Sequence, residues 1–371
     1  MNALPPDVRA VVAKSGLSPE LVEALCARLR HRGALGESVL RGHLAQPASS
    51  DIAQAPTTPA LCEKLTDEGE AALQTGGVGL VVLNGGMATR FDGAVKGCVT
   101  ALDDISFLGL KLRDALRAAE RAKAPPPPVL LMNSRATAAA TAAHLEAHGW
   151  FGYPKARIWA FEQHWAPRFT PTGDLFLGAD QQPSFYGPGH GDLLPCLRES
   201  GLLARFAAAG GRTLLMSNVD NALATLDPVL LGDHGRRAEP ITVEVVDKAP
   251  GDRGGIPLRV DGHLQVVEAF RLPADFDQDA VPVFNTNTFW LDIDAFEANV
   301  ELTWFAVQKD VEGRPAVQFE RLIGELTAHL PTRFVRVPRE GARSRFIPVK
   351  TPEDLDAARA ALRRAWQREE A

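Results

Sequence analysis

The chain has 371 residues, of which 45% are hydrophobic and 23% are charged, and this composition is ordinary for a globular protein with one large domain or two. Its formal net charge of −6 provides no overall positive field, which argues against a nucleic-acid partner. No apolar run is long enough to span a bilayer and no signal-peptide region begins the chain, so we expect no membrane partner and a cytoplasmic location.

In chain order, the first predicted element is a helical N-terminal extension over residues 1–70. The stretch "SPELVEALCARLRHR" places apolar residues at helical spacing after Ser18, a residue type that suits a helix N-cap. The stretch "QPASSDIAQAPTTPA" that follows is rich in Pro, Ser and Thr. Such a composition is typical of a linker or an extended loop.

From Gly76 onward the pattern changes to alternating strands and helices. Strands are predicted at "VGLVVLN", "PVLLMN", "RTLLMSN", "ITVEVVDK", "HLQVVEAF" and "TNTFWLDI", and helices at "FLGLKLRDALRAAERAK" and "RATAAATAAHLEAHG". This alternation predicts an α/β fold with a mainly parallel sheet, covered on both faces, that binds ligands at the carboxyl ends of its strands. We assign this domain to residues 71–350, followed by a C-terminal helix at 351–371.

The stretch "VVLNGGMATRF" ends an aliphatic strand at Gly85 and Gly86, with Arg90 and Lys96 following shortly after. The motifs G-x-G-x-x-G and G-x-x-x-x-G-K-[ST] are both absent, which excludes the common dinucleotide and P-loop signatures. Glycines allow backbone N–H groups to approach a phosphate or a base edge, and two cations nearby could neutralise phosphate oxygens. A tight turn with two exposed cations explains this stretch alone equally well.

Further stretches place polar side chains beside glycines or at strand ends. They are "LLMNSRAT" with Met132, "FEQHWAPRF" with Gln163, "YGPGHGDLL" with Gly189 and His190, "LLMSNVDNALA" with Asn218 and Asp220, "FNTNTFW" with Asn285 and Asn287, and "SRFIPVK" with Lys350. In this order, together with the glycine-rich loop and a lysine preceding a Gly-Gly pair, they resemble the UTP–glucose-1-phosphate uridylyltransferase (UDP-glucose pyrophosphorylase) family from about Val81 to Leu355. Eight motifs in family order make this resemblance specific.

The resemblance implies a Rossmann-like, GT-A-like nucleotidyltransferase fold, a mixed sheet flanked by helices. It implies that UTP and a sugar 1-phosphate, expected to be glucose 1-phosphate, give a UDP-sugar and pyrophosphate. A sugar-phosphate oxygen attacks the α-phosphorus of UTP in line, so catalysis consists of positioning and charge neutralisation without a protein nucleophile. Mg²⁺ is the implied cofactor, and Asp220 is its expected ligand.

The resemblance also implies a role for each matching residue. For the nucleotide these are Gly85, Gly86, Met132 and Asn218, with Gln163 and the Gly189 backbone reading uracil, since an amide offers both a donor and an acceptor. For the phosphates these are Arg90, Lys96, Lys248 and Lys350; for the sugar phosphate, His190, Glu268, Asn285 and Asn287. The structural alternatives are a plain loop position for Gln163 and helix capping for Asp220.

The sequence departs from the family pattern in the glycine-rich loop. Met87-Ala88 stands where a small residue and a glycine are usual, and Ala94-Val95 where proline commonly precedes the lysine. A catalytically inactive nucleotide-sugar-binding protein therefore remains an alternative, as does a UDP-N-acetylhexosamine or broad-specificity UDP-sugar pyrophosphorylase. "PGHGD" resembles the glucose branch, because the N-acetylglucosamine branch tends to carry asparagine in place of the histidine. Eukaryotic relatives continue into a C-terminal β-helix; we expect this protein to be a short form without it, and we form no expectation about oligomers.

Overall fold

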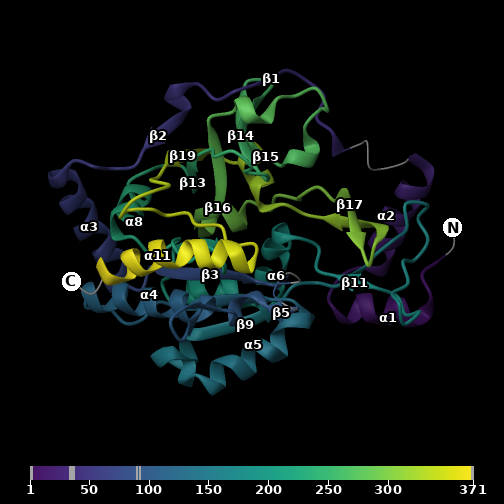
Figure 1. Cartoon of the computed structure of the whole chain (residues 1–371), viewed down its shortest axis with the longest axis horizontal. Helices are drawn as coiled ribbons and strands as arrows, with labels where there is room; N and C mark the ends of the chain where they lie inside the picture. The colour runs from purple at the N-terminus through teal and green to yellow at the C-terminus, as the bar shows by residue number, and fades with distance from the viewer. Residues whose placement is uncertain (1–2, 33–37, 89–90, 92, 369–371) are drawn as a thin grey trace.

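The computed structural model describes residues 3–32, 38–88, 91 and 93–368. Its centre is an eight-stranded sheet in the order β2-β19-β13-β16-β12-β3-β8-β9 (Figure 1). The strands are β2 (Ile52–Gln54), β19 (Thr332–Arg336), β13 (Ile241–Asp247), β16 (Val283–Asp292), β12 (Thr213–Asn218), β3 (Val78–Asn84), β8 (Val129–Asn133) and β9 (Ile158–Glu162). Only β16 runs antiparallel to its two neighbours. The predicted mixed, mainly parallel α/β fold is confirmed.

Helices flank this sheet. They are α3 (Pro59–Gln74), α4 (Phe107–Arg121), α5 (Arg135–Ala147), α6 (Leu193–Glu199), α7 (Leu202–Ala208), α8 (Pro228–Gly235), α9 (Ile293–Glu297), α10 (Leu326–His329) and α11 (Pro352–Arg368). The start of α4 shows how the sequence sets a boundary, because the Ser106 hydroxyl accepts a hydrogen bond from the Gly109 N–H at 3.1 Å. None of the helices in the described ranges is both long and apolar enough to cross a bilayer.

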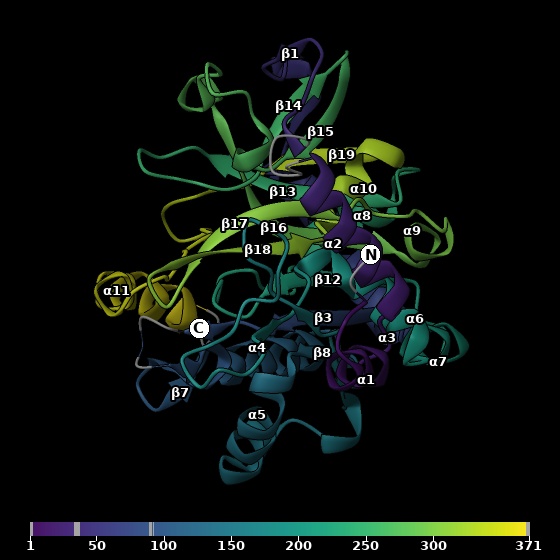
Figure 2. The same cartoon turned by 90° about the vertical axis from the view of Figure 1, so that its right-hand side faces the viewer.

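Smaller strands build the surroundings of the main sheet. One three-stranded sheet joins β1 (Leu44–Ala45), β14 (Ile256–Val260) and β15 (His263–Val267), at the end of the molecule opposite α5 (Figure 2). Paired strands are β10 (Ala166–Pro167) with β11 (Phe185–Tyr186), β17 (Phe305–Val311) with β18 (Arg314–Glu320), β4 (Met87–Ala88) with β5 (Ala94–Val95), and β6 (Thr100–Leu102) with β7 (Ile105–Ser106). The predicted strand "HLQVVEAF" thus forms, but outside the main sheet.

The N-terminal helices α1 (Pro6–Lys14) and α2 (Pro19–Arg32) lie beside β11 and β17, away from α3 (Figure 1). The Ser18 hydroxyl accepts from the Leu21 N–H at 3.2 Å, which confirms the predicted N-cap. These helices share a hydrophobic core, separate from that of the sheet, with Ala166, Phe169 and Tyr186 and with the β17–β18 hairpin. The N-terminal helices therefore pack against the segment between β9 and α6.

The stretch "QPASSDIAQAPTTPA" differs from the linker expected of it. Ile52–Gln54 form β2, which pairs in parallel with β19 at the edge of the main sheet. A three-residue edge strand is too short to show alternation of apolar and polar residues, and it needs little burial. Its surrounding Pro, Ser and Thr residues therefore dominate the pattern.

Candidate active site

Two adjoining cavities open at the edge of the sheet where the parallel strands end. The larger cavity has a volume of about 520 Å³ and the smaller pocket one of about 240 Å³. His190, Asn218 and Asp220 line both. Because β16 is antiparallel to β12 and β13, its amino end contributes to the same edge as their carboxyl ends. The fold thus brings the predicted motifs of distant segments to one place.

Gln163 lies between two glycines in the larger cavity. A Cβ atom at Gly85 would be 2.6 Å from Gln163 Nε2, and one at Gly187 would be 2.0 Å from it. Both positions therefore require glycine, which has no side chain. The Gln163 N–H donates to the Asn133 carbonyl at 2.8 Å. Its side-chain amide has no hydrogen-bond partner within the described ranges, so a donor and an acceptor face the cavity.

The larger cavity also has an aromatic wall that the sequence analysis missed. The Trp165 and Phe185 rings stack with centroids 5.3 Å apart and an interplanar angle of 13°, and the Arg135 guanidinium lies 4.6 Å from the Trp165 ring centroid. Arg168 lines the same wall. Trp165 lies two positions after Gln163 in the stretch "FEQHWAPRF". Its place in that motif was the one sequence feature that could have predicted this wall.

The Gly189 peptide is engaged within its own turn. Its N–H donates to the Gly187 carbonyl at 2.8 Å, and its carbonyl accepts from the Asp192 N–H at 3.2 Å. Its φ of +81° is a conformation that favours glycine, and a Cβ there would lie 2.7 Å from the Arg321 carbonyl. Gly189 therefore shapes the turn, while Gly187 lies closer to the amide of Gln163.

A lysine and an aspartate meet where the two cavities join. Lys96 Nζ lies 3.4 Å from Asp220 Oδ2, with side-chain exposures of 12% and 29%. The same ammonium donates to the Val349 carbonyl and lies 5.1 Å from the Phe91 ring centroid. Lys96 thereby connects the glycine-rich loop to the "FIPVK" segment, next to Lys350 at the rim of the smaller pocket.

His190 is held as a neutral hydrogen-bond donor. Its Nδ1 accepts from the Ile323 N–H at 3.0 Å, and burial lowers its pKa to about 4. A neutral imidazole that accepts at Nδ1 carries its proton on Nε2. The ring can thus donate to an oxygen in either cavity.

An irregularity of β16 shapes the smaller pocket. Its register with β13 shifts between Glu244 and Val245, which leaves Thr286 and Asn287 as extra residues. Asn287 adopts φ +56°, a conformation that asparagine tolerates better than most residues. Its side chain donates to Asn218 Oδ1 at 3.0 Å, and its N–H donates to Asn285 Oδ1 at 3.1 Å.

Glu268 also lines the smaller pocket. Burial, reinforced by the nearby Glu320 carboxylate, raises the pKa of Glu268 to about 7. Gly255 permits this arrangement, because a Cβ there would lie 2.8 Å from Glu268 Oε1 and 3.1 Å from Asn285 Nδ2. The pocket therefore offers a carboxyl group and several amides at close quarters.

Of the predicted phosphate ligands, Lys248 stands apart from these cavities. Lys248 lines neither of them: its ammonium donates to the Gln278 carbonyl and, at 2.9 Å, to Asp279. Arg90 lies outside the described residues, as does the side chain of Ala88. Met132 is buried at the end of β8 and lines the larger cavity.

Buried charges hold the loop that follows β12. Lys111 donates to the Ser217 hydroxyl at 2.9 Å and to the Ala224 carbonyl at 2.8 Å, and burial lowers its pKa to about 7. Arg345 binds Glu244 through Nε at 2.6 Å, and its carbonyl accepts from Asn221 Nδ2 at 3.1 Å. The loop carrying Asp220 is thus fixed at both ends by satisfied polar groups.

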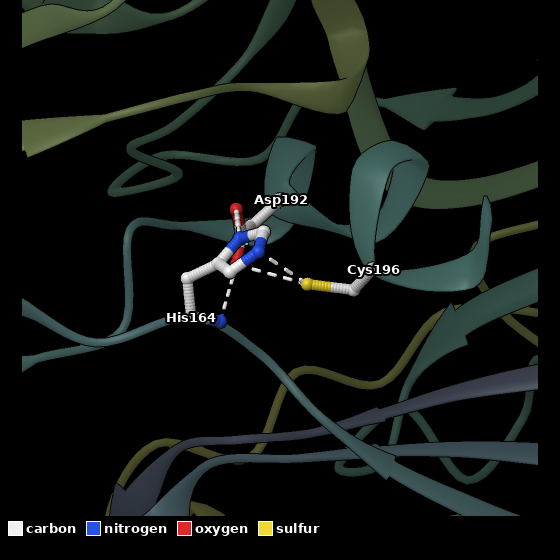
Figure 3. Close-up of side chains that lie close together, drawn as sticks. All are labelled: His164, Asp192 and Cys196. Atoms are coloured by element: carbon white, nitrogen blue, oxygen red, sulfur yellow. Dashed lines mark hydrogen bonds and ion pairs between the residues drawn. The ribbon is translucent and has the colours of Figure 1, made fainter. Parts of the chain in front are cut away.

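Behind the Gln163 segment, His164, Asp192 and Cys196 form a buried cluster (Figure 3). His164 Nδ1 lies 2.8 Å from Asp192 Oδ1, and the Cys196 thiol lies 3.3 Å from Asp192 Oδ2. The Arg321 guanidinium also contacts Asp192, and a cation so close opposes a metal ion. We interpret the cluster as structural: it connects the Gln163 segment with the His190 turn.

The fold and this arrangement of glycine-rich loop, amide and lysine–aspartate pair are those of the Rossmann-like nucleotidyltransferases. The sequence model of one family, UTP–glucose-1-phosphate uridylyltransferase, matches residues 37–366, and the chain belongs to that family. The resemblance noted from the motifs is thereby confirmed.

Two curated relatives and one solved structure illustrate the similarity. The chain is 28% identical over 318 residues to UTP–glucose-1-phosphate uridylyltransferase 2 of Dictyostelium discoideum, covering 80% of this chain and 60% of that protein. It is 30% identical over 294 residues to the Saccharomyces cerevisiae UTP–glucose-1-phosphate uridylyltransferase, covering 74% and 57%. The chain thus spans about 60% of the length of these relatives. The uridine diphosphate N-acetylglucosamine pyrophosphorylase of Trypanosoma brucei shares the fold, with a TM-score of 0.75, 20% identity and coverage of 95% and 79%.

Proposed function

We propose that this protein is a uridylyltransferase that converts UTP and glucose 1-phosphate into UDP-glucose and pyrophosphate. The observation that supports it most is the junction of two cavities at His190, Asn218 and Asp220, with Lys96 beside Asp220. Two polyanionic reactants need adjoining sites with a cationic group between them. The names of the curated relatives favour the same reaction.

The larger cavity suits a uracil nucleotide. The free donor and acceptor of the Gln163 amide match a base edge that carries one N–H flanked by two carbonyls. Gly85 and Gly187 hold that amide in place from both sides, and the Trp165–Phe185 pair adds an aromatic surface. Recognition of uracil over other bases follows from this amide.

The chemistry needs no nucleophile from the protein. An oxygen of the sugar phosphate forms a bond to the α-phosphorus of UTP, while the bond from that phosphorus to the α,β-bridging oxygen breaks and its electron pair leaves with pyrophosphate. Lys96 neutralises phosphate charge, and neutral His190 donates its Nε2 proton in a hydrogen bond to a phosphate oxygen. Lys350 binds the sugar phosphate from the rim of the smaller pocket.

Asp220 fits the role of a Mg²⁺ ligand. Within the described ranges Lys96 is the one group paired with its carboxylate, which leaves oxygen lone pairs directed at the junction. A magnesium ion bound with substrate phosphates usually takes one or two carboxylates and keeps several waters. When bound, it supplies positive charge that offsets the charge of the phosphates. Asn221 and the buried Arg345 orient the loop from behind.

The smaller pocket suits a hexose. Asn285 and Asn287 present amide groups, and Glu268 presents a carboxyl group that accepts from a sugar hydroxyl. Glucose is the sugar we propose, on the names of the relatives and on the histidine of "PGHGD". Epimers differ by one or two hydrogen bonds, so other sugar 1-phosphates serve as the comparison in the test.

Release of pyrophosphate from each NTP with a panel of sugar 1-phosphates tests this proposal. We expect turnover with UTP and glucose 1-phosphate, and a fall in kcat of about 10²–10³-fold in Lys96→Ala, as for loss of a charge-stabilising group. Lys155→Ala is the matched control, because Lys155 pairs with Glu146 on the exposed surface. UDP-glucose binding without pyrophosphate release by the wild type would instead favour an inactive nucleotide-sugar-binding protein.

A further inference from the structure

The segment that carries Gln163 is anchored at three consecutive residues. The Gln163 N–H donates to Asn133 at the end of β8, and the His164 N–H donates to Asp192 Oδ2, both at 2.8 Å. The Trp165 N–H donates to the Ser15 hydroxyl at 3.0 Å. The main sheet, the His190 turn and the N-terminal helices thus each hold one peptide of this segment.

The third anchor belongs to the turn between α1 and α2. The Ser15 hydroxyl donates to the Val12 carbonyl at 2.7 Å, which orients its oxygen toward Trp165. Gly16, at φ +93°, lies against the neighbouring side chain: a Cβ there would be 3.0 Å from His164 Nε2 and 3.1 Å from Glu199 Oε2. Since Glu199 bonds His164 Nε2 at 2.9 Å, the turn contacts both residues that follow Gln163.

Apolar packing reinforces these contacts. Val8 and Val12 of α1 are fully buried in a core that also contains Ala166, Phe169 and Tyr186, and Tyr186 lines the larger cavity. Tyr186 directly precedes Gly187, the glycine that confines the Gln163 amide. A shift of α1 would therefore move the Gln163 segment together with the Gly187 side of its amide.

We propose that the Ser15–Gly16 turn positions Gln163, so that the N-terminal helices belong to the nucleotide site and set the affinity for UTP. This inference rests on the function proposed above and extends it to residues that touch no substrate. Ser15 and Gly16 act through Trp165 and His164. Loss of the Ser15 hydrogen bond weakens nucleotide binding and leaves the smaller pocket unchanged.

Calorimetric titration of UTP tests this role directly. We expect Ser15→Ala to raise the UTP Kd about three- to tenfold, since a hydrogen bond is worth on the order of 1 kcal/mol. Ser15→Thr keeps the hydroxyl and should restore most of the affinity. Gly16→Ala should also raise the UTP Kd, because the added Cβ would displace His164. The φ of Gly16 is in addition one that favours glycine. The KM for glucose 1-phosphate should stay within twofold in Ser15→Ala and Ser15→Thr, which leave His164 in place.

Ser18→Ala provides the matched control. It removes the N-cap of α2 but no contact with the Gln163 segment, so it should lower Tm while the UTP Kd stays constant. An unchanged UTP Kd in Ser15→Ala and Gly16→Ala, with wild-type UTP binding intact, overturns the positioning role alone. Absence of UTP binding by the wild type contradicts the proposed function, and the positioning role with it.

Discussion

The larger cavity and the smaller pocket solve the problem of holding a ligand in different ways. The larger cavity sits on the regular ends of β3, β8 and β12, and Gly85 and Gly187 leave room for the Gln163 amide between them. The smaller pocket is built where regular structure fails, at the shifted register of β16 and a left-handed asparagine. The carboxyl of Glu268 in this pocket has a pKa of about 7, so its charge changes with pH near neutrality.

This difference indicates what each site can discriminate. A planar base edge has one pattern of donors and acceptors, which a rigid amide on regular strands reads well. A sugar presents hydroxyls in several directions, and irregular backbone is better able to aim short polar side chains at them. Variation among relatives in sugar specificity should therefore concentrate around β16 and Glu268.

Asp220→Asn should impair both sites together, because Asp220 lines both cavities. We expect kcat to fall about 10²–10³-fold with either substrate saturating, as for other groups that stabilise developing charge. Steady-state pyrophosphate release at several Mg²⁺ concentrations measures this. Asp275→Asn, at an exposed position, is the control, and equal activity of the two variants would remove the metal role from Asp220.

Gly187→Ala should affect the larger cavity alone. The new Cβ would lie 2.0 Å from Gln163 Nε2, so the amide must leave its position and lose its pairing with uracil. We expect the KM for UTP to rise about 10–100-fold, the effect of one or two lost hydrogen bonds in a specific site. Gly235→Ala has open space around its Cβ and should change neither KM. A rise in the glucose 1-phosphate KM in Gly187→Ala would contradict the separation of the two sites.

Glu268→Gln should affect the smaller pocket alone, and by the smallest amount. Because the pKa of Glu268 is about 7, its carboxylate, the stronger acceptor, accumulates between pH 6 and 8. We expect the wild-type KM for glucose 1-phosphate to fall about three- to tenfold over that range relative to the glutamine variant. Because the sugar phosphate titrates equally with both proteins, its effect cancels in the ratio of wild-type to variant KM. Parallel pH profiles of the two proteins would exclude a role for the Glu268 carboxylate in sugar binding.

The same raised pKa has a consequence for folding. The pKa of this carboxyl is higher in the folded chain than its ordinary value of 4.5. The free energy of unfolding therefore falls as the pH rises from 4.5 toward 7, because ionising the carboxyl costs more in the folded state than in the unfolded state. Wild-type Tm should thus decline relative to Glu268→Gln between about pH 4.5 and 7. Differential scanning calorimetry of both proteins at matched pH measures this.

Much of the fold was predictable because its central strands are unambiguous. "VGLVVLN", "PVLLMN" and "RTLLMSN" are continuous apolar runs, as expected of buried parallel strands. β2 was not predicted, because three residues at a sheet edge are too few to show an alternation of apolar and polar side chains. The pairing of β15 outside the main sheet depends on partners far along the chain, which local patterns do not encode.

Part of the candidate site was predictable because several of its motifs directly follow strands. Lys96, Asp220, His190 and Asn287 all line the cavities as expected from their motifs. Lys248 also follows a strand, but its partners Gln278 and Asp279 come from a turn thirty residues away. Gly187 could have been found from its spacing in "YGPGHGD"; the role we propose for Ser15 could not, since nothing local connects residues 15 and 165.

The triple anchoring at residues 163–165 has a consequence for how the chain tolerates changes in length. A segment tied at every residue has no slack, so a single insertion there would break at least one anchor and turn the amide away. The turn at residues 179–182 is exposed and is closed by hydrogen bonds within residues 178–182, and none of these residues lines the larger cavity. We therefore expect this turn to tolerate loop grafts and affinity tags better than residues 163–165 do.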